Sequence, residues 1–211
     1  MSKAMGVIVL ILWPGLVWAQ GVTIAALGDS LTQGYGLPAG QGFVPQLERW
    51  LQDQGQDVTV INAGVSGDTT AGGLSRVDWT LTPNVDGLIV TLGGNDLLRG
   101  ISPEVSRANL DGILKAADTA GVAVLLVGMQ APGNYGPEYK AAFDQMYPEL
   151  AATYGTLYAE SFFEGVGGAG TDPASLGEFM QADGIHPNAT GVARIVEGLG
   201  PAVLDLVRRS Q

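Results

Sequence analysis

Short, continuous apolar runs alternate with segments of helical periodicity along most of the chain, and this alternation limits the folds open to it. Strands with apolar residues on both faces, separated by helices, are typical of a parallel sheet covered on both sides. The pattern therefore predicts an α/β fold, a three-layer α/β/α sandwich around a five-stranded parallel sheet. The five expected strands are residues 22–27, 58–61, 85–92, 122–129 and 156–159.

The segments between these runs predict helices over 43–54, 70–79, 103–120, 138–154 and 190–209. The third has clear boundary signals, because Ser102 can cap it, Pro103 fits its first position and Gly121 follows its end. Pro148 is expected to interrupt or bend the fourth helix. The Gly-rich stretch 165–170 is expected to be a loop, and the sequence shows no repeat and no inter-domain linker.

The first residues have the features of a targeting signal. Lys3 gives a positive start, residues 5–17 form an apolar run too short to span a bilayer comfortably, and residues 17–19 fit a cleavage site. We expect a signal peptide over residues 1–19, cleaved after Ala19, with an uncleaved N-terminal anchor as the alternative.

The rest of the chain, residues 20–211, has the length of one domain. The sequence contains no cysteine, so disulfides, thiolate metal sites and lipid attachment to a cysteine are excluded. With a single histidine as well, a metal site is not expected. An export signal together with the absence of cysteine predicts a periplasmic or secreted bacterial protein.

The charge balance argues against several classes of partner. The net charge is −11, and it becomes −12 when the signal is removed with Lys3. Such an acidic protein repels nucleic acid, anionic membranes and coenzyme A esters at long range. We expect a small-molecule ester or lipid substrate, no nucleic-acid partner, no stable membrane span after signal removal, and a monomer.

Residues suited to catalysis follow the strands. Ligands of an open parallel sheet bind beyond the carboxyl ends of its strands. Ser30 follows the first expected strand, Gly64 the second and Asn95 the third, and Asp183 and His186 lie between the fifth strand and the last helix. The fold should therefore bring these residues to one rim of the sheet.

These residue types fit nucleophilic catalysis. A serine hydroxyl is a poor nucleophile until a base removes its proton, and a carboxylate usually holds that base in one tautomer. His186 is the only histidine, and Asp183 lies three residues before it, close enough to reach its ring. The backbone N–H groups of Ser30 and Gly64 and the side-chain amide of Asn95 would supply donors for an oxyanion.

With these residues in place, the chain resembles the SGNH hydrolases, also called GDSL esterases and lipases. The matching blocks are 28–31 (GDSL), 62–64 (NAG), 93–96 (GGND), and Asp183 with His186. The resemblance covers residues 22 to about 200. Segments 62–70 (NAGVSGDTT) and 129–139 (MQAPGNYGPEY) look like the small periplasmic branch of arylesterases, lysophospholipases and acyl-CoA thioesterases.

The resemblance implies a flavodoxin-like SGNH hydrolase fold and an enzyme without a cofactor. It implies Ser30 as nucleophile, His186 as base and Asp183 as the residue that orients it, with Ser30, Gly64 and Asn95 as the oxyanion hole. The implied reaction is hydrolysis of carboxylic esters: aryl esters and short to medium acyl esters, with lysophospholipids or thioesters as further candidates. The G-x-S-x-G elbow of the α/β-hydrolases is absent, since residue 32 is Thr.

Met129, Pro132, Asn134 and Tyr135 follow the fourth strand and are candidates for the wall of an acyl or alcohol pocket, with ordinary loop packing as the alternative. Asp96 is expected to be structural, holding the loop 93–95 through its backbone amides.

Two other functions stay open. One is an acyltransferase that uses the same acyl-enzyme. The other is a non-catalytic, flavodoxin-like module that binds a phosphate-bearing ligand at the Gly-rich turn 28–34, although that turn lacks a P-loop lysine and G-x-G-x-x-G spacing.

Overall fold

The computed structural model describes residues 21–167 and 173–211, and its centre is a single sheet of five parallel strands. The strand order is β2-β1-β3-β4-β5. This sheet confirms the predicted α/β class. The strands are β1 (Val22–Gly28), β2 (Val58–Gly64), β3 (Gly87–Thr91), β4 (Ala123–Val127) and β5 (Leu157–Ala159).

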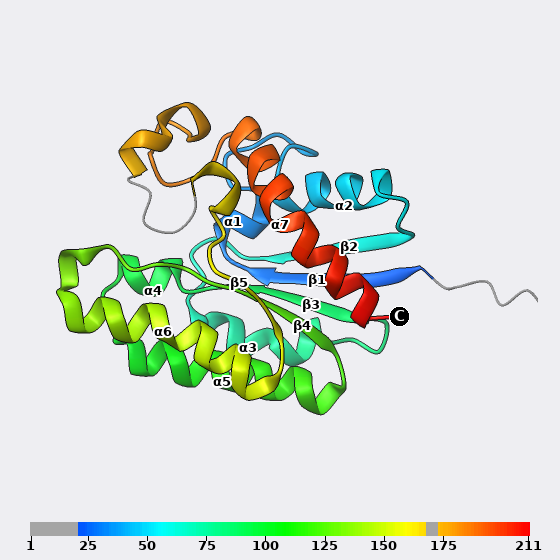
Figure 1. Cartoon of the computed structure of the whole chain (residues 1–211), viewed down its shortest axis with the longest axis horizontal. Coiled ribbons are helices and arrows are strands. Elements are labelled where there is room, and N and C mark those ends of the chain that lie inside the picture. The colour runs from blue at the N-terminus through cyan, green and yellow to red at the C-terminus, as the bar shows by residue number, and fades with distance from the viewer. Residues whose placement is uncertain (1–20, 168–172) are drawn as a thin grey trace, which may run out of the picture.

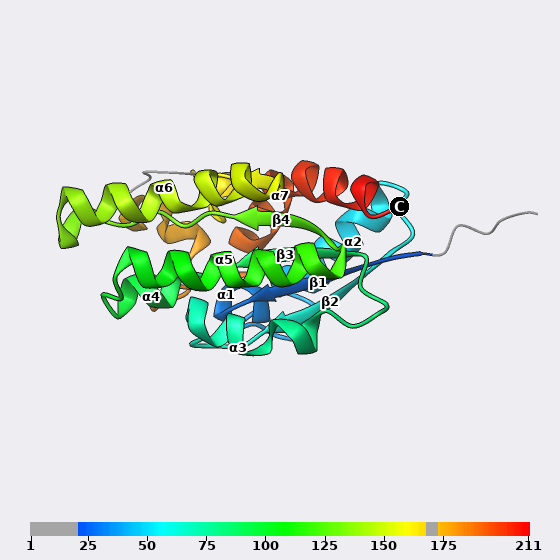
Figure 2. The same ribbon diagram turned by 90° about the horizontal axis from the view of Figure 1, so that it is seen from below.

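Helices cover both faces of the sheet, which gives the three layers (Figure 1). On one face lie α1 (Ser30–Gln33), α2 (Phe43–Asp53) and α7 (Ala189–Arg209). On the other lie α3 (Thr70–Thr80), α5 (Pro103–Ala120) and α6 (Pro137–Tyr154), which run side by side in Figure 2. Within the described ranges, no helix is long and apolar enough to cross a bilayer.

The apolar periodicity explains how α7 is held. Its buried residues recur three or four positions apart, so they form one stripe that packs on β3, β4 and β5. Every residue of β3 is buried, as expected for a central strand covered by helices on both faces. The stripe of α7 comprises Val192, Ile195, Val196, Leu199, Val203, Leu206 and Val207.

Some expected boundaries need correction. Ser102 occupies the cap position of α5, but its side chain makes no capping hydrogen bond, whereas Gly121 ends the helix in the left-handed conformation with φ +68°. Pro148 does not interrupt α6, which is helical from Pro137 to Tyr154. In the Gly-rich stretch, residues 165 and 166 belong to a 3-10 turn (Glu164–Val166), and residues 168–170 lie outside the described residues.

The topology places the site. From β1 the chain moves to β2 at one side and then to β3 at the other, so the strand order reverses between β1 and β3. Such a switch point leaves a crevice at the carboxyl ends of the two strands. The segments that follow β1 and β3 carry Ser30 and Asn95. These two residues therefore flank the crevice.

Candidate active site

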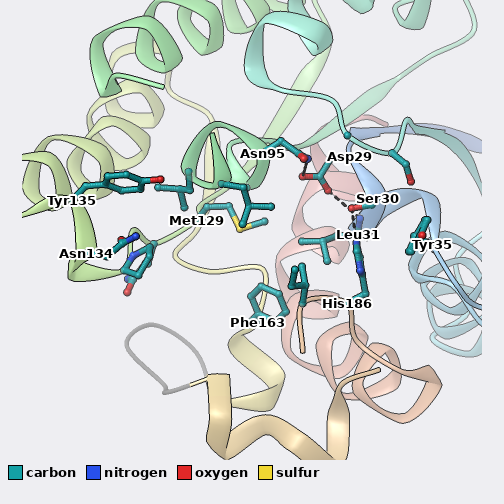
Figure 3. A pocket seen from close by; sticks show the side chains of 18 residues that line it. Asp29, Ser30, Leu31, Tyr35, Asn95, Met129, Asn134, Tyr135, Phe163 and His186 are labelled. Atoms are coloured by element: carbon teal, nitrogen blue, oxygen red, sulfur yellow. Dashed lines mark hydrogen bonds between the residues drawn. The ribbon is translucent and has the colours of Figure 1, made fainter. Parts of the chain in front are cut away.

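Ser30 is held at a sharp turn from strand to helix. It is the first residue of α1, and Asp29 caps this four-residue helix by accepting the backbone N–H of Leu31 at 3.0 Å. Only glycine fits at position 28, two residues before Ser30, because a Cβ there would lie 2.0 Å from Oγ1 of Thr32 and 2.9 Å from the Thr91 carbonyl oxygen. The turn holds the Ser30 hydroxyl at the carboxyl edge of the sheet, facing the imidazole of His186 (Figure 3).

Ser30, His186 and Asp183 form one chain of hydrogen bonds. His186 Nε2 lies 2.9 Å from Ser30 Oγ, and His186 Nδ1 lies 2.7 Å from Asp183 Oδ2. A carboxylate can only accept, so Nδ1 carries the proton and Nε2 is left to accept from the serine hydroxyl. The three residues that the sequence singled out are therefore in contact, in the order that proton transfer requires.

The Asp183 carboxylate is held in its charged form. Its Oδ1 accepts the backbone N–H groups of His186 and Ile185 at 3.0 and 2.9 Å. These bonds and the hydrogen bond to the imidazole lower the pKa of Asp183 to about 2. The two contacts with His186, first the backbone bond and then the side-chain bond, contribute most. Because this pKa lies below its usual value, Asp183 stays ionised until the pH falls to about 2.

The loop that carries His186 is anchored at both ends. An isolated antiparallel bridge pairs Met180 with Pro187, and the N–H of Gln181 donates to the His186 carbonyl at 2.7 Å. The Tyr35 ring also packs on the imidazole, with centroids 4.7 Å apart. Sequence reasoning missed Tyr35, which lies five residues after the nucleophile with no motif to mark it.

Asn95 lies beside Asp29 across the crevice. It belongs to α4 (Gly94–Leu98), a short helix after β3, and its Nδ2 donates to Asp29 Oδ2 at 3.1 Å. The neighbouring Asp96 is buried and accepts the N–H and hydroxyl of Thr70 and the hydroxyl of Ser106. Asp96 is thus structural as expected, but it ties α4 to α3 and α5 instead of holding the amides of its own loop.

Asp29 is the buried acid of the site. It is 2% exposed, and this burial is the main reason why its pKa rises to about 6. The hydrogen bonds from Leu31 and Asn95 oppose the rise without cancelling it. The folded protein therefore binds this proton more tightly than the unfolded chain does, so Asp29 lowers the stability as the pH rises from about 4 to about 6.

We predict that Asp29→Asn removes this pH dependence. The free energy of unfolding of the variant, relative to wild type, should increase by up to about 3 kcal/mol between pH 4 and pH 7. Urea unfolding of both proteins at the two pH values measures the difference. A difference that stays constant with pH would contradict the assignment.

The structure does not place Gly64 where the sequence analysis expects it. The Gly64 N–H donates to Asn62 Oδ1 at 3.0 Å, and a Cβ on Gly64 would lie 2.3 Å from the backbone nitrogen of Gln33. Gly64 thus packs against α1 as the last paired residue of β2. Gly67 lines the pocket instead, with φ +83°, and its carbonyl accepts Arg99 Nη2 at 2.8 Å.

The pocket in front of Ser30 has a volume of about 520 Å³. In Figure 3, the Ser30–His186 pair lies near one end and Asn134 and Tyr135 lie toward the other, with Met129 between them. Met129, Pro132, Asn134 and Tyr135 all line it, as the sequence suggested. Apolar side chains that the sequence analysis missed complete the wall: Leu31, Leu97, Leu98, Phe163 and Ile185.

Comparisons with known proteins show which family the chain matches. A family model described as the GDSL-like Lipase/Acylhydrolase family matches residues 26–194. Esterase TesA of Pseudomonas aeruginosa is 41% identical over 190 residues, which cover 90% of this chain and 91% of that protein. The Escherichia coli protein named thioesterase 1/protease 1/lysophospholipase L1 is 36% identical over 191 residues, 90% of this chain and 86% of that one.

A solved structure is similar as well. The crystal structure of AlinE4, a SGNH-hydrolase family esterase, matches with a TM-score of 0.72 and 41% identity, covering 89% of this chain and 97% of that chain. Nearly the whole described chain therefore shares both sequence and fold with these proteins. With its serine on the turn after β1 and its Asp183–His186 pair beside it, the chain belongs to the GDSL-like lipase/acylhydrolase family.

Proposed function

We propose that this protein is a carboxylic ester hydrolase that forms an acyl-enzyme on Ser30. The observation that carries the proposal is the hydrogen-bonded chain from Ser30 through His186 to Asp183 at the edge of an apolar pocket. The names of the similar proteins, an esterase and a thioesterase/lysophospholipase, support the same reaction class.

In the first half of the reaction, Ser30 Oγ attacks the ester carbonyl while His186 Nε2 takes the hydroxyl proton. Asp183 keeps Nδ1 protonated and stabilises the imidazolium that forms. Collapse of the tetrahedral intermediate breaks the bond to the alcohol, and His186 returns the proton to the leaving oxygen. Water then attacks the acyl-serine with His186 as base again, which releases the acid and restores the serine.

The negatively charged oxygen of the tetrahedral intermediate needs hydrogen-bond donors close to Ser30. The Ser30 N–H and the Asn95 amide come from α1 and α4, the short helices that follow β1 and β3, and Gly67 on the pocket wall takes the position expected of Gly64. The Asp29 carboxylate binds one hydrogen of the Asn95 Nδ2, which orients the amide and leaves its second hydrogen for the oxyanion.

We expect Asn95→Ala to lower kcat by about 10²- to 10³-fold, since an oxyanion donor acts mainly on the transition state. KM should change little. Steady-state kinetics with an aryl ester measure both constants, and Asn84→Ala, in the exposed loop before β3, is the control. A loss confined to KM would argue against this role.

The pocket supports a neutral acyl or aryl substrate. Its wall is mostly apolar, and Asp29 is the only acidic residue on it, with no lysine or arginine among the described residues that line it. Among the described lining residues, a bound anionic group would find no lysine or arginine to pair with. We therefore propose aryl esters and short to medium acyl esters as substrates, with lysophospholipids and thioesters ranked after them.

A substrate panel tests the proposed function. Rates should be measured for p-nitrophenyl esters of increasing acyl length, a lysophospholipid and an acyl thioester, with glycerol added in a parallel series. Free acid as the main product supports hydrolysis, whereas a glyceryl ester would indicate acyl transfer. The absence of turnover on every ester would overturn the proposal.

We also propose that the protein is exported. The signal features lie in residues 1–20, outside the described residues, so the proposal rests on their sequence. Mass spectrometry of the protein from a host with a periplasm should give a mature chain that begins at Gln20. A chain that keeps residues 1–19 would contradict cleavage.

A further inference from the structure

Arg76 joins three backbone segments at the edge of the proposed site. It lies on α3, which packs against β1. Its Nη2 donates to the Gly28 carbonyl at 2.9 Å, its Nη1 to the Ala63 carbonyl at 2.7 Å, and its Nε to Asp68 Oδ2 at 2.6 Å. All three nitrogens of one guanidinium are therefore engaged.

These contacts are not those of an ordinary surface ion pair. The side chains of Arg76 and Asp68 are only 22% and 18% exposed. By contrast, Arg107 and Glu149, another pair at 2.6 Å, are 41% and 54% exposed. A partly buried guanidinium with three fixed acceptors has little freedom to move, because its donors lie in one rigid plane.

Two of the three acceptors of Arg76, the Gly28 carbonyl and Asp68, adjoin parts of the proposed machinery in the sequence. The Gly28 carbonyl belongs to the peptide that leads into Asp29 and Ser30. Asp68 directly follows Gly67, and the N–H of Asp68 closes a turn on the Val65 carbonyl at 3.1 Å. The guanidinium thus connects the nucleophile segment with the turn that carries Gly67.

This connection lies just beyond the carboxyl ends of β1 and β2. Their paired register ends at Gly28 and Gly64, and beyond that point no strand ladder fixes the spacing between the two segments. The Val65 N–H donates to the Gly28 carbonyl at 3.0 Å, and Asn62 and Ser66 each bond to Gln33 of α1. Arg76 adds the bonds that join the Gly28 and Ala63 carbonyls to Asp68 through one rigid group.

We propose that Arg76 is a positioning residue for ester hydrolysis, one that sets the placement of Gly67 relative to Ser30 through its bonds to Gly28, Ala63 and Asp68. The inference rests on the proposed function. Arg76 does not contact the substrate. A displacement of about 1 Å in a catalytic group can cost about 100-fold in rate, so a residue of this kind acts on kcat.

The test compares Arg76→Lys with Asp68→Ala, the double variant and Arg107→Lys. A lysine keeps the charge but cannot hold three acceptors in one plane. We expect Arg76→Lys to lower kcat by about 10- to 100-fold with KM within threefold of wild type. Asp68→Ala should lower kcat in the same way, and Arg107→Lys should leave it unchanged.

Two readouts separate positioning from general stabilisation. Circular dichroism and thermal unfolding show whether each variant is folded at the assay temperature, and kcat is compared only among folded proteins. The double variant should lose less in kcat than the product of the two single losses, since both changes break the same connection. If Arg76→Lys does not fold, the kcat of Asp68→Ala alone tests the proposal.

Folded variants of Arg76 or Asp68 with wild-type kcat would overturn the inference and leave the proposed function intact. If the wild-type protein itself hydrolyses no ester, the proposed function fails first. The two failures are therefore distinguishable in one series of measurements.

Discussion

Ser30→Ala is expected to reduce kcat for ester hydrolysis by about 10⁶-fold, to the level left by binding and oxyanion stabilisation alone. The hydroxyl is the atom that the acyl group must join, and no other serine among the described residues is hydrogen-bonded to the imidazole of His186. Steady-state rates with a p-nitrophenyl ester measure the loss over many orders of magnitude.

The fold should survive this change. Ser30 contributes no capping bond to α1, because Asp29 supplies that bond, and alanine is a good helix residue. Circular dichroism and thermal unfolding of the variant should match those of wild type. Ser66→Ala, a serine on the same pocket wall whose hydroxyl bonds to Gln33, is the matched control. Equal rates for Ser30→Ala and wild type would refute the nucleophile.

His186→Gln is expected to cause a loss of similar size, about 10⁵- to 10⁶-fold in kcat, because nucleophile and base act as one unit. Glutamine can donate a hydrogen bond to Ser30 but cannot take its proton. Since His186 is the only histidine in the chain, a histidine-selective reagent should inactivate the wild-type enzyme by modifying a single ring. Full activity after complete modification would contradict the assignment.

The pH profile separates His186 from the two nearby carboxyl groups. The rate should fall on acidification, because a general base must be unprotonated to take the serine proton. Asp183, with a pKa of about 2, stays ionised until the pH falls to about 2. Burial raises the pKa of Asp29 to about 6, so Asp29 also gains a proton on acidification and Asp29→Asn is the control. The fall in rate at low pH should persist in Asp29→Asn. If the variant no longer shows that fall, the fall belongs to Asp29 and not to His186.

The sequence predicted the sheet well because its signal is spread over many residues. Five apolar runs and the helices between them repeat at the strand and helix periods, so single misleading residues cannot change the outcome. The short helices α1 and α4, with four and five residues, escaped detection, since neither is long enough to show a period. They nevertheless carry Ser30 and Asn95.

The sequence analysis assigned Gly64 to the oxyanion hole, whereas Gly67 is the glycine that lines the pocket. Both glycines lie in the segment 62–70, and the sequence alone does not reveal how far β2 continues. Pairing with Gly28 extends the strand to Gly64, whose N–H then binds Asn62. The following turn brings Gly67 to the pocket. A useful signal was the Ser-Gly-Asp run at 66–68, which is typical of a tight turn.

Covalent labelling tests the central claim most directly. An activated phosphonate ester carrying a short neutral alkyl group should react once per chain, releasing its leaving group as the serine oxygen bonds to phosphorus. Mass spectrometry of the digested protein should then find the adduct on Ser30, and Ser30→Ala should stay unlabelled. An adduct on another residue, or equal labelling of the variant, would contradict the claim that Ser30 is the nucleophile.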